Sequence, residues 1–196
     1  MSDSRSWPAT LLVPGDMFVL AELHAMKLDG VLVPVVGDVF RPGTLPETPA
    51  LRAAALTLSI PAALEKRAVL GQLAAAWIYG CAPPPLVISL LVPNDGNTAF
   101  LPAQSGCTLR QVHLDAADVQ GLGGALVTSP LRTAVDVART APQGTARAVV
   151  AAMAGQAALR CSLGGIEQAL AAAVHVPGKL RAQELLHSML DAGRQP

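Results

Sequence analysis

The alternation of apolar and polar positions divides the chain into three parts. In the first part, residues 16–28 show a helical pattern that ends at Gly30, and residues 31–40 read as two short strands that turn at Gly37 and Asp38. In the second part, short apolar runs alternate with loops as far as residue 140. The third part is helical in pattern throughout, so the strands of the main sheet are expected to come from the second part.

The second part supplies the predicted core. A continuous apolar run at residues 86–92 and an alternating run at residues 108–114 have the length of strands, and a further strand closes at Val127 after a turn containing Gly121, Gly123 and Gly124. Helices are predicted at residues 51–59, 71–79, 130–140, 144–158, 163–173 (with Ser162 as N-cap) and 179–192. The predicted fold class is α/β (α+β), a mixed sheet with helices and a helical C-terminal region.

A helix followed by a β-hairpin matches the second half of a winged helix-turn-helix. We therefore predict a partial winged-helix-like module at residues 1–46, an α/β core at residues 47–140 and a helical region at residues 141–196. The predicted hairpin tip at residues 33–38 carries no Lys or Arg. The nearby basic residues are Lys27 and Arg41, which makes them the candidate nucleic-acid contacts of this module.

Residues 128–139 read as the end of a strand that runs into a helix. The Ser129 hydroxyl can cap the helix, and Pro130 stands at the first helical position, where its missing N–H costs nothing. Arg132 and Asp136 are one turn apart and can form an ion pair. The buried face of this helix is predicted to carry Leu131, Val135 and Ala138.

The composition does not favour a nucleic-acid binder. Fourteen basic and fourteen acidic residues give no net charge, whereas nucleic-acid binders usually show a basic excess. Hydrophobic residues make up 52% of the chain and aromatic residues only 3%, which fits an Ala- and Leu-rich helical core or an apolar surface that a partner covers. The sequence leaves both explanations open.

We expect a cytoplasmic protein. Residues 68–93 carry no charge, but Gly80 and the prolines at 83–85 interrupt that segment before it reaches the roughly 20 residues of a membrane span. Residues 1–10 lack the apolar core of a signal peptide. The three cysteines are odd in number and widely spaced, which is typical of free thiols in a reducing compartment.

The sequence gives no support for catalysis. The histidines are isolated, with no further ligand at metal-binding spacing, and no arrangement of Ser, His and Asp or of paired carboxylates points to hydrolysis. The glycines at 121–124 precede a strand rather than a helix, unlike a phosphate-binding loop. We therefore expect no enzyme activity, no metal and no cofactor.

Three blocks of sequence resemble the AbiEi family of antitoxins. They are the helix and hairpin at residues 22–41 followed by residues 49–52, the segment Ala-Ala-Trp-Ile-Tyr-Gly at residues 75–80, and residues 110–119 followed by residues 128–139. The last of these resembles the family motif Thr-(Ser/Thr)-Pro-x-Arg-Thr-x-x-Asp-x-Ala-Arg. The resemblance implies an antitoxin, paired in a type IV toxin–antitoxin operon with a nucleotidyltransferase toxin that it neutralises, here by direct binding.

The candidate partner-binding residues are Trp77, Tyr79, Arg132, Asp136 and Arg139. Trp77 and Tyr79 suit either core packing or an interface hot spot. Arg132 and Asp136 suit either an internal ion pair or a partner site, and Arg139 suits a solvated position near the helix C-terminus. Two further functions remain open: a transcriptional regulator bound to operator DNA, and a non-catalytic remnant of a Vsr-like nuclease protein.

Overall fold

A five-stranded mixed sheet lies at the centre of the computed structural model, which describes residues 11–96, 99–174 and 176–192. The strand order is β5-β4-β3-β7-β6. β3 pairs with β7 in parallel and with β4 in antiparallel orientation, β4 and β5 are parallel, and β6 and β7 form an antiparallel hairpin. The strands are β3 Val69–Leu70, β4 Ile88–Pro93, β5 Cys107–Val112, β6 Val119–Leu122 and β7 Ala125–Thr128.

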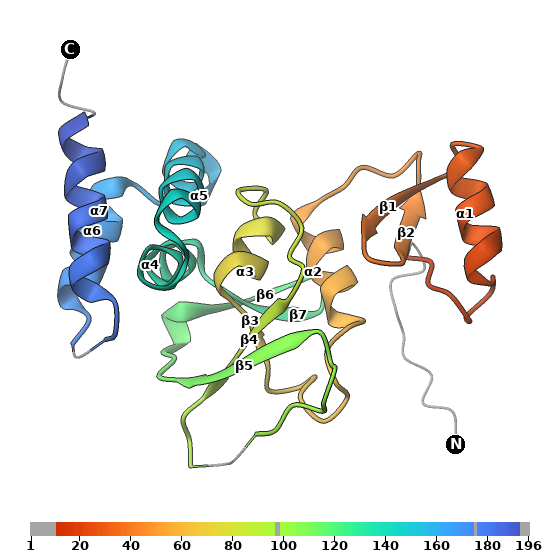
Figure 1. Ribbon diagram of the computed structural model, residues 1–196, viewed down its shortest axis with the longest axis horizontal. Coiled ribbons are helices and arrows are strands. Elements are labelled where there is room, and N and C mark those ends of the chain that lie inside the picture. The colour runs from red at the N-terminus through yellow and green to blue at the C-terminus, as the bar shows by residue number, and fades with distance from the viewer. Residues whose placement is uncertain (1–10, 97–98, 175, 193–196) are drawn as a thin grey trace.

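Three helices lie on one side of this sheet (Figure 1): α2 Pro49–Thr57, α3 Gln72–Ile78 and α4 Pro130–Thr140. Alanines at 53–55 in α2 and at 74–76 in α3 are buried, and such small side chains let a helix backbone approach the sheet closely. Leu70, Leu90 and Val127 from the central strands belong to the same buried cluster as these alanines. The main core therefore lies between the sheet and these three helices.

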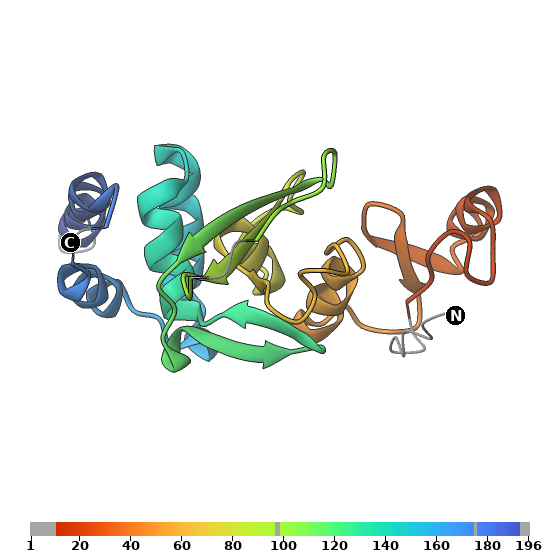
Figure 2. The same cartoon turned by 90° about the horizontal axis from the view of Figure 1, so that it is seen from below.

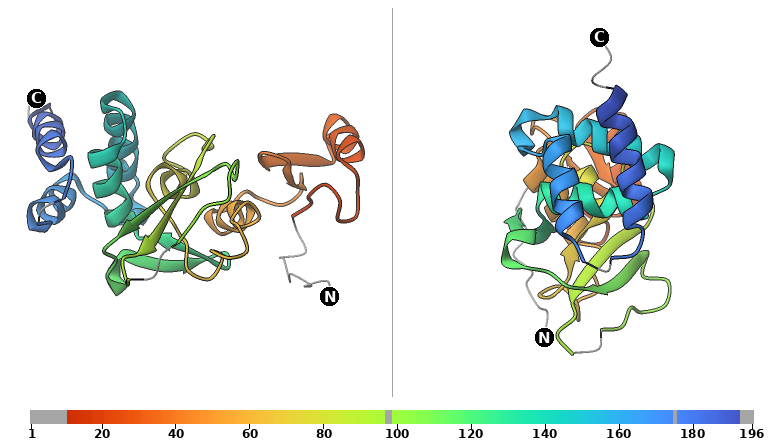
Figure 3. Two further views of the ribbon diagram at one scale, coloured as in Figure 1. Left: turned by 60° about the horizontal axis from the view of Figure 1, so that its bottom comes forward. Right: turned by 90° about the vertical axis from the view of Figure 1, so that its left-hand side faces the viewer.

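In the described part of the C-terminal region, three α-helices lie beside α4 (Figure 3): α5 Gln143–Gly155, α6 Leu163–Ala172 and α7 Lys179–Ala192. Ile166, Leu170 and Leu186 from this region are fully buried and extend the main core. The predicted N-cap of α6 is confirmed, because the Gly165 N–H donates to Ser162 Oγ at 3.1 Å.

The N-terminal module, residues 11–46, holds helix α1 Leu20–Leu28 and the hairpin of β1 Leu32–Val36 and β2 Val39–Pro42. Its own small core is formed by Leu23, Leu32 and Phe40. The hairpin lies between α1 and the rest of the chain (Figure 2), and its side chains Val35 and Val39 join the main core. Mixed α/β structure with a helical C-terminal region is confirmed. The division at residues 46 and 140 stays a prediction, since the main core draws on all three predicted parts.

The first helix starts four residues later than predicted. The segment before it instead forms β-bridges, Leu12 with Phe40 and Pro14 with Phe18. Glu22 Oε2 accepts the Val19 N–H at 2.9 Å, which satisfies one free amide at the helix start.

Two expectations for the start of α4 were wrong. Ser129 occupies the N-cap position, but its side chain makes no capping hydrogen bond. Leu131 is exposed, whereas Val135 and Ala138 are buried as predicted.

The turn before β7 is shorter than predicted, and β6 occupies part of it. Gly121 is a residue of β6, and the turn consists of Gly123 and Gly124, both with positive φ. A Cβ on Gly123 would lie 1.9 Å from the Ala50 carbonyl oxygen. Only glycine therefore allows this hairpin to approach the start of α2 so closely.

Candidate functional site

The candidate site centres on Asp136, a carboxylate on the face of α4 that lies in the protein interior. The helix buries the run from Thr133 to Ala138, so Asp136 is removed from water. The Asp136 side chain is only 6% exposed. A buried carboxylate is costly unless charged partners compensate for the lost water.

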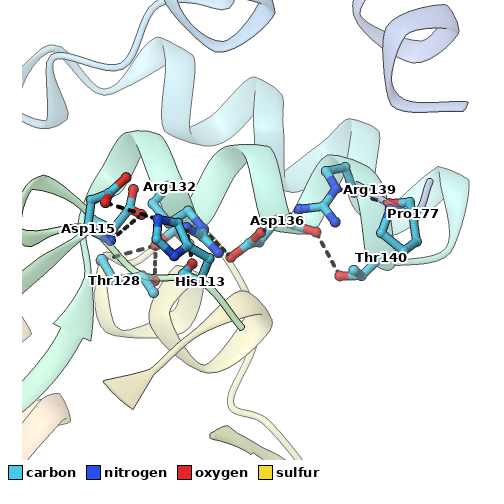
Figure 4. Close-up of polar contacts among 10 residues, drawn as sticks. His113, Asp115, Thr128, Arg132, Asp136, Arg139, Thr140 and Pro177 are labelled. Atoms are coloured by element: carbon cyan, nitrogen blue, oxygen red, sulfur yellow. Dashed lines mark hydrogen bonds and ion pairs between the residues drawn. The ribbon is translucent and has the colours of Figure 1, made fainter. Parts of the chain in front are cut away.

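Two arginines of the same helix supply that compensation (Figure 4). Arg132 Nε donates to Asp136 Oδ2 at 2.8 Å, and Arg139 Nη1 donates to Asp136 Oδ1 at 3.1 Å. The ion pair predicted between Arg132 and Asp136 is confirmed. Arg139 differs from the expectation of a solvated side chain, because it is only 12% exposed.

Each arginine also reaches a second structural element. Arg132 Nη1 donates to Asp118 Oδ2 at 2.6 Å and to the His113 carbonyl oxygen at 3.1 Å, which joins α4 to the segment between β5 and β6. Arg139 Nε donates to the Pro177 carbonyl oxygen at 3.0 Å, in the connection between α6 and α7. The α4 cluster, defined as Asp118, Arg132, Asp136 and Arg139, therefore holds three separate segments together.

The electrostatics of the α4 cluster follow from burial and charge pairing. Burial opposes the charge on Arg132, but Asp136 and Asp118 outweigh it and raise the Arg132 pKa. For Arg139, burial has the larger effect and lowers the pKa. Burial also raises the pKa of Asp136 against the attraction of the two guanidinium groups. The cluster thus holds its charges through mutual pairing rather than through contact with water.

A second hydrogen-bonded group links α3 to the start of α4. Tyr79 Oη donates to the Thr128 carbonyl oxygen at 2.5 Å and accepts from Gln120 Nε2 at 2.8 Å. Thr133 Oγ1 donates to the same Thr128 carbonyl at 3.1 Å. Burial raises the pKa of Tyr79 to about 12, so its hydroxyl keeps its proton at any physiological pH.

Arg52 connects α2 to the end of α3. Its Nη1 donates to the Trp77 carbonyl oxygen at 2.9 Å, its guanidinium lies 5.4 Å from the centre of the Trp77 ring, and its Nε donates to Glu47. Trp77 and Tyr79 are both buried in the core. The segments at 49–52, 75–80 and 128–139 are therefore joined to one another by hydrogen bonds from side chains to carbonyl oxygens.

The structure brings Arg132, Asp136 and Arg139 together. The two nucleic-acid candidates, Lys27 and Arg41, lie apart from them in the N-terminal module. Lys27 is exposed on α1. Arg41 is turned inward, where its Nη1 donates to the carbonyl oxygens of Pro42 and Leu45 and its Nη2 lies 4.0 Å from Glu47. That arrangement leaves Lys27 as the exposed basic side chain of the two.

Sequence reasoning missed Arg52, Asp118 and Thr133. The signal for Arg52 was its place in the block at residues 49–52, and the signal for Thr133 was its spacing from Thr128. Asp118 lies in the block at residues 110–119, but it is 14 residues before Arg132, and no helical or strand period connects the two.

All three cysteine thiols have raised pKa values. Burial raises the pKa of the Cys81 and Cys107 thiols, and burial together with the neighbouring Cys81 raises that of Cys161 to about 11. Within the described ranges, no group of three or more His, Cys, Asp or Glu side chains could hold a metal ion. In the same ranges, no single helix is long and apolar enough to span a membrane. The segments Gln143–Gly155 and Ala157–Ala172 reach that length and apolar character only as a pair, and the chain bends by 84° between them.

The hydrogen bonds of Arg52, Tyr79, Arg132 and Arg139 join segments that lie far apart in the sequence. The family model of the AbiEi antitoxin C-terminal domain matches residues 67–188, from just before β3 into α7. This is more than half of the chain, so the chain belongs to the AbiEi antitoxin family, as the resemblance predicted. Membership implies a non-catalytic protein of a toxin–antitoxin system with a cognate toxin as partner. No curated protein matches the chain.

Proposed function

We propose that this protein is the antitoxin of a nucleotidyltransferase toxin and neutralises it by direct binding. The main support for this proposal is the family match over residues 67–188. A member of an antitoxin family is expected to have a cognate toxin. The class of toxin rests on the resemblance of the motif at residues 128–139 to antitoxins of nucleotidyltransferase operons.

The polar side chains of the matched domain are engaged in internal contacts, which supports a binding function rather than a catalytic one. Arg132, Asp136 and Arg139 are engaged with one another and with neighbouring backbone, so they stabilise the shape of the domain. A partner would then bind the surface of the domain that these contacts stabilise. An interface of ordinary size covers about 800 Å² of each partner.

Co-expression with the product of the neighbouring gene, which we expect to be a nucleotidyltransferase, tests the proposal. We expect growth to be restored and the two proteins to elute together in gel filtration. A toxin that carries a substitution in its own catalytic site serves as the control for toxicity. Separate elution with toxicity unrelieved would contradict direct neutralisation.

A second candidate function is regulation of its own operon through operator DNA. The observation in its favour is the arrangement of α1 against the β1–β2 hairpin, with Lys27 exposed on the helix. Binding of this kind weakens steeply as salt rises. A mobility-shift assay with the upstream DNA tests it, and no shift at low salt would eliminate it.

A further inference from the structure

The connection between β5 and β6 forms a loop that one arginine fastens at both ends. Arg132 Nη1 donates to the His113 carbonyl oxygen at 3.1 Å and to Asp118 Oδ2 at 2.6 Å. One nitrogen thus holds both the first and the last residue of the segment, which is typical of a compact surface loop whose ends lie close together. Figure 4 shows His113 and Asp115 beside Arg132. We call residues 113–118 the β5–β6 loop.

The middle of the β5–β6 loop has few bonds to the rest of the protein. Among the described residues, the hydrogen bonds of residues 114–117 stay within the loop: the Asp115 N–H donates to Asp118 Oδ2 at 3.1 Å, and the Asp118 N–H donates to the Asp115 carbonyl oxygen at 2.9 Å. The end of the loop has one further bond, from the Ser129 N–H to the Asp118 carbonyl oxygen at 2.7 Å. The side chains of His113 and Asp115 are 88% and 72% exposed. A segment with so few buried contacts opens at a low cost in free energy.

A cleft lies beside the β5–β6 loop. Leu114, Asp115 and Ala116 of the loop line this cleft, of about 360 Å³, together with Val69 and Leu126 of the sheet. Val69 and Leu126 are paired across β3 and β7, and their sequence neighbours belong to the main core. Because side chains alternate between the two faces of a sheet, Val69 and Leu126 point away from the helices that cover the core. The loop therefore borders free volume, into which it can move without displacing packed side chains.

Release of the β5–β6 loop leaves no buried charge without a partner. Arg132 holds the loop through Nη1 but holds Asp136 through Nε, at 2.8 Å, so the guanidinium group keeps one carboxylate when Nη1 lets go. The Asp118 side chain is 23% exposed, so water can replace the lost bond there. The large penalty for a buried unpaired charge therefore does not oppose the opening.

We propose that the β5–β6 loop is a lid, which opens as one unit on release from Arg132 and uncovers Val69 and Leu126 in the cleft. Arg132 is then a positioning residue that sets the population of the closed state. The open state is a minor one that exposes apolar surface hidden in the closed state. The inference concerns the isolated chain and does not depend on the proposed function.

Amide exchange followed by NMR in the full chain tests the lid. The amides of Asp115 and Asp118, which bond within the loop, should exchange at least about 100-fold faster than those of β7. Arg132→Lys keeps a positive charge beside Asp136 but lacks the forked group that reaches both ends of the loop. We expect it to speed the exchange of these two amides by a further factor of about ten.

The matched control is Arg139→Lys. Arg139 bonds to the other oxygen of Asp136, but its further bond goes to the Pro177 carbonyl oxygen and not to the loop. Amides that exchange through local opening do not respond to a loss of global stability. The control should therefore leave the exchange of the Asp115 and Asp118 amides within about twofold of the parent chain.

Thiol labelling reports whether the cleft itself is uncovered. Val69 is 2% exposed, so a thiol introduced by Val69→Cys reacts with iodoacetamide only when the cleft opens. We expect Arg132→Lys to raise the labelling rate of this thiol about tenfold, and Arg139→Lys to leave it within about twofold. Mass spectrometry of the peptides separates this thiol from Cys81, Cys107 and Cys161, and circular dichroism shows whether each variant keeps the fold.

Several results would overturn the lid. Loop amides that exchange as slowly as those of β7 in the parent chain would show that the loop does not open by itself. Equal acceleration by Arg132→Lys and Arg139→Lys would mean that the loop opens only with the whole domain, and no acceleration by Arg132→Lys would show that this arginine does not hold it. Faster loop amides with unchanged labelling of the introduced thiol would show that the loop moves without uncovering the cleft.

Discussion

The matched antitoxin domain and the N-terminal module use their side chains in opposite ways. In the domain, buried charges are paired across segments, as Arg132 joins Asp136 to Asp118 and to the His113 backbone. In the module, the charged side chains other than Arg41 are exposed, and several large apolar side chains are exposed too. The domain holds three separate segments together, whereas the module's own core cluster has three buried residues, Leu23, Leu32 and Phe40.

This difference indicates a division of roles. A network of buried ion pairs fixes one arrangement of helices, because any other arrangement leaves a charge without its partner. A small module with an exposed apolar face gains stability when another surface covers it. Substitutions in each region measure whether the two differ in this way.

The largest expected effect comes from Asp136→Ala in the α4 cluster. The change leaves the Arg132 and Arg139 guanidinium groups buried without their shared carboxylate, and breaking such a pair costs about 3–5 kcal/mol. Urea denaturation followed by circular dichroism measures the free energy of unfolding. The exposed Asp38→Ala is the control, and a loss below about 1 kcal/mol for Asp136→Ala would show that the cluster does not hold the domain.

The next effect is expected from Leu23→Ala, which empties the centre of the module's small core. A buried Leu→Ala change costs about 2–4 kcal/mol. We expect amide exchange to rise across residues 11–42 while the helices of the matched domain keep their protection. If α4 and α6 lose protection to the same extent, the two regions unfold as one unit and the comparison fails.

A smaller effect follows from the raised pKa of Tyr79, the chain's one tyrosine. Its folded pKa of about 12 lies above the usual value of about 10, so its contribution to stability is complete below pH 10 and is lost as the pH rises through 12. A shift of this size corresponds to about 2–3 kcal/mol. Absorbance at about 295 nm reports the phenolate directly.

Tyr79→Phe separates the hydrogen bond from the packing of the ring. It removes the donor to the Thr128 carbonyl oxygen and should cost about 1–2 kcal/mol. Gln120→Ala, which alters only the partner on the exposed side, should cost less than about 0.5 kcal/mol. A titration midpoint near 10 in the folded protein would show that the hydroxyl is reached by water.

The smallest effect on stability is expected from Met17→Glu/Leu28→Glu. Both side chains are exposed, so the free energy of unfolding should change by less than about 0.5 kcal/mol. Urea denaturation beside the parent chain checks this. A loss above about 2 kcal/mol would mean that Met17 and Leu28 contribute to the fold.

Local patterns predicted most of the helices and the pair of Arg132 with Asp136. These features depend on neighbours three or four residues apart, so the sequence alone specifies them. Ser162 as the cap of α6 belongs to the same class, since the N–H that donates to its hydroxyl, that of Gly165, lies three residues away.

Contacts between segments that are far apart in the sequence could not be predicted from such local patterns. Arg52 lies 25 residues before its partner Trp77, and Arg139 lies 38 residues before Pro177. Strand β3 has two residues, too few for periodicity to reveal, and its pairing with β7 exists only because the fold brings both strands together. The family resemblance pointed to the right blocks, and the structure supplied the hydrogen bonds that join them.

Direct titration of the purified toxin with this protein tests the central claim, neutralisation by binding. Nucleotidyl transfer is followed while the antitoxin is added, and light scattering on a gel-filtration column gives the mass of the complex. We expect the nucleotidyl-transfer activity to fall linearly as antitoxin is added and to reach zero at a fixed molar ratio. The complex should then have the mass of the two chains combined in that ratio. Full toxin activity at a large excess of antitoxin, with the two proteins eluting separately, would contradict it.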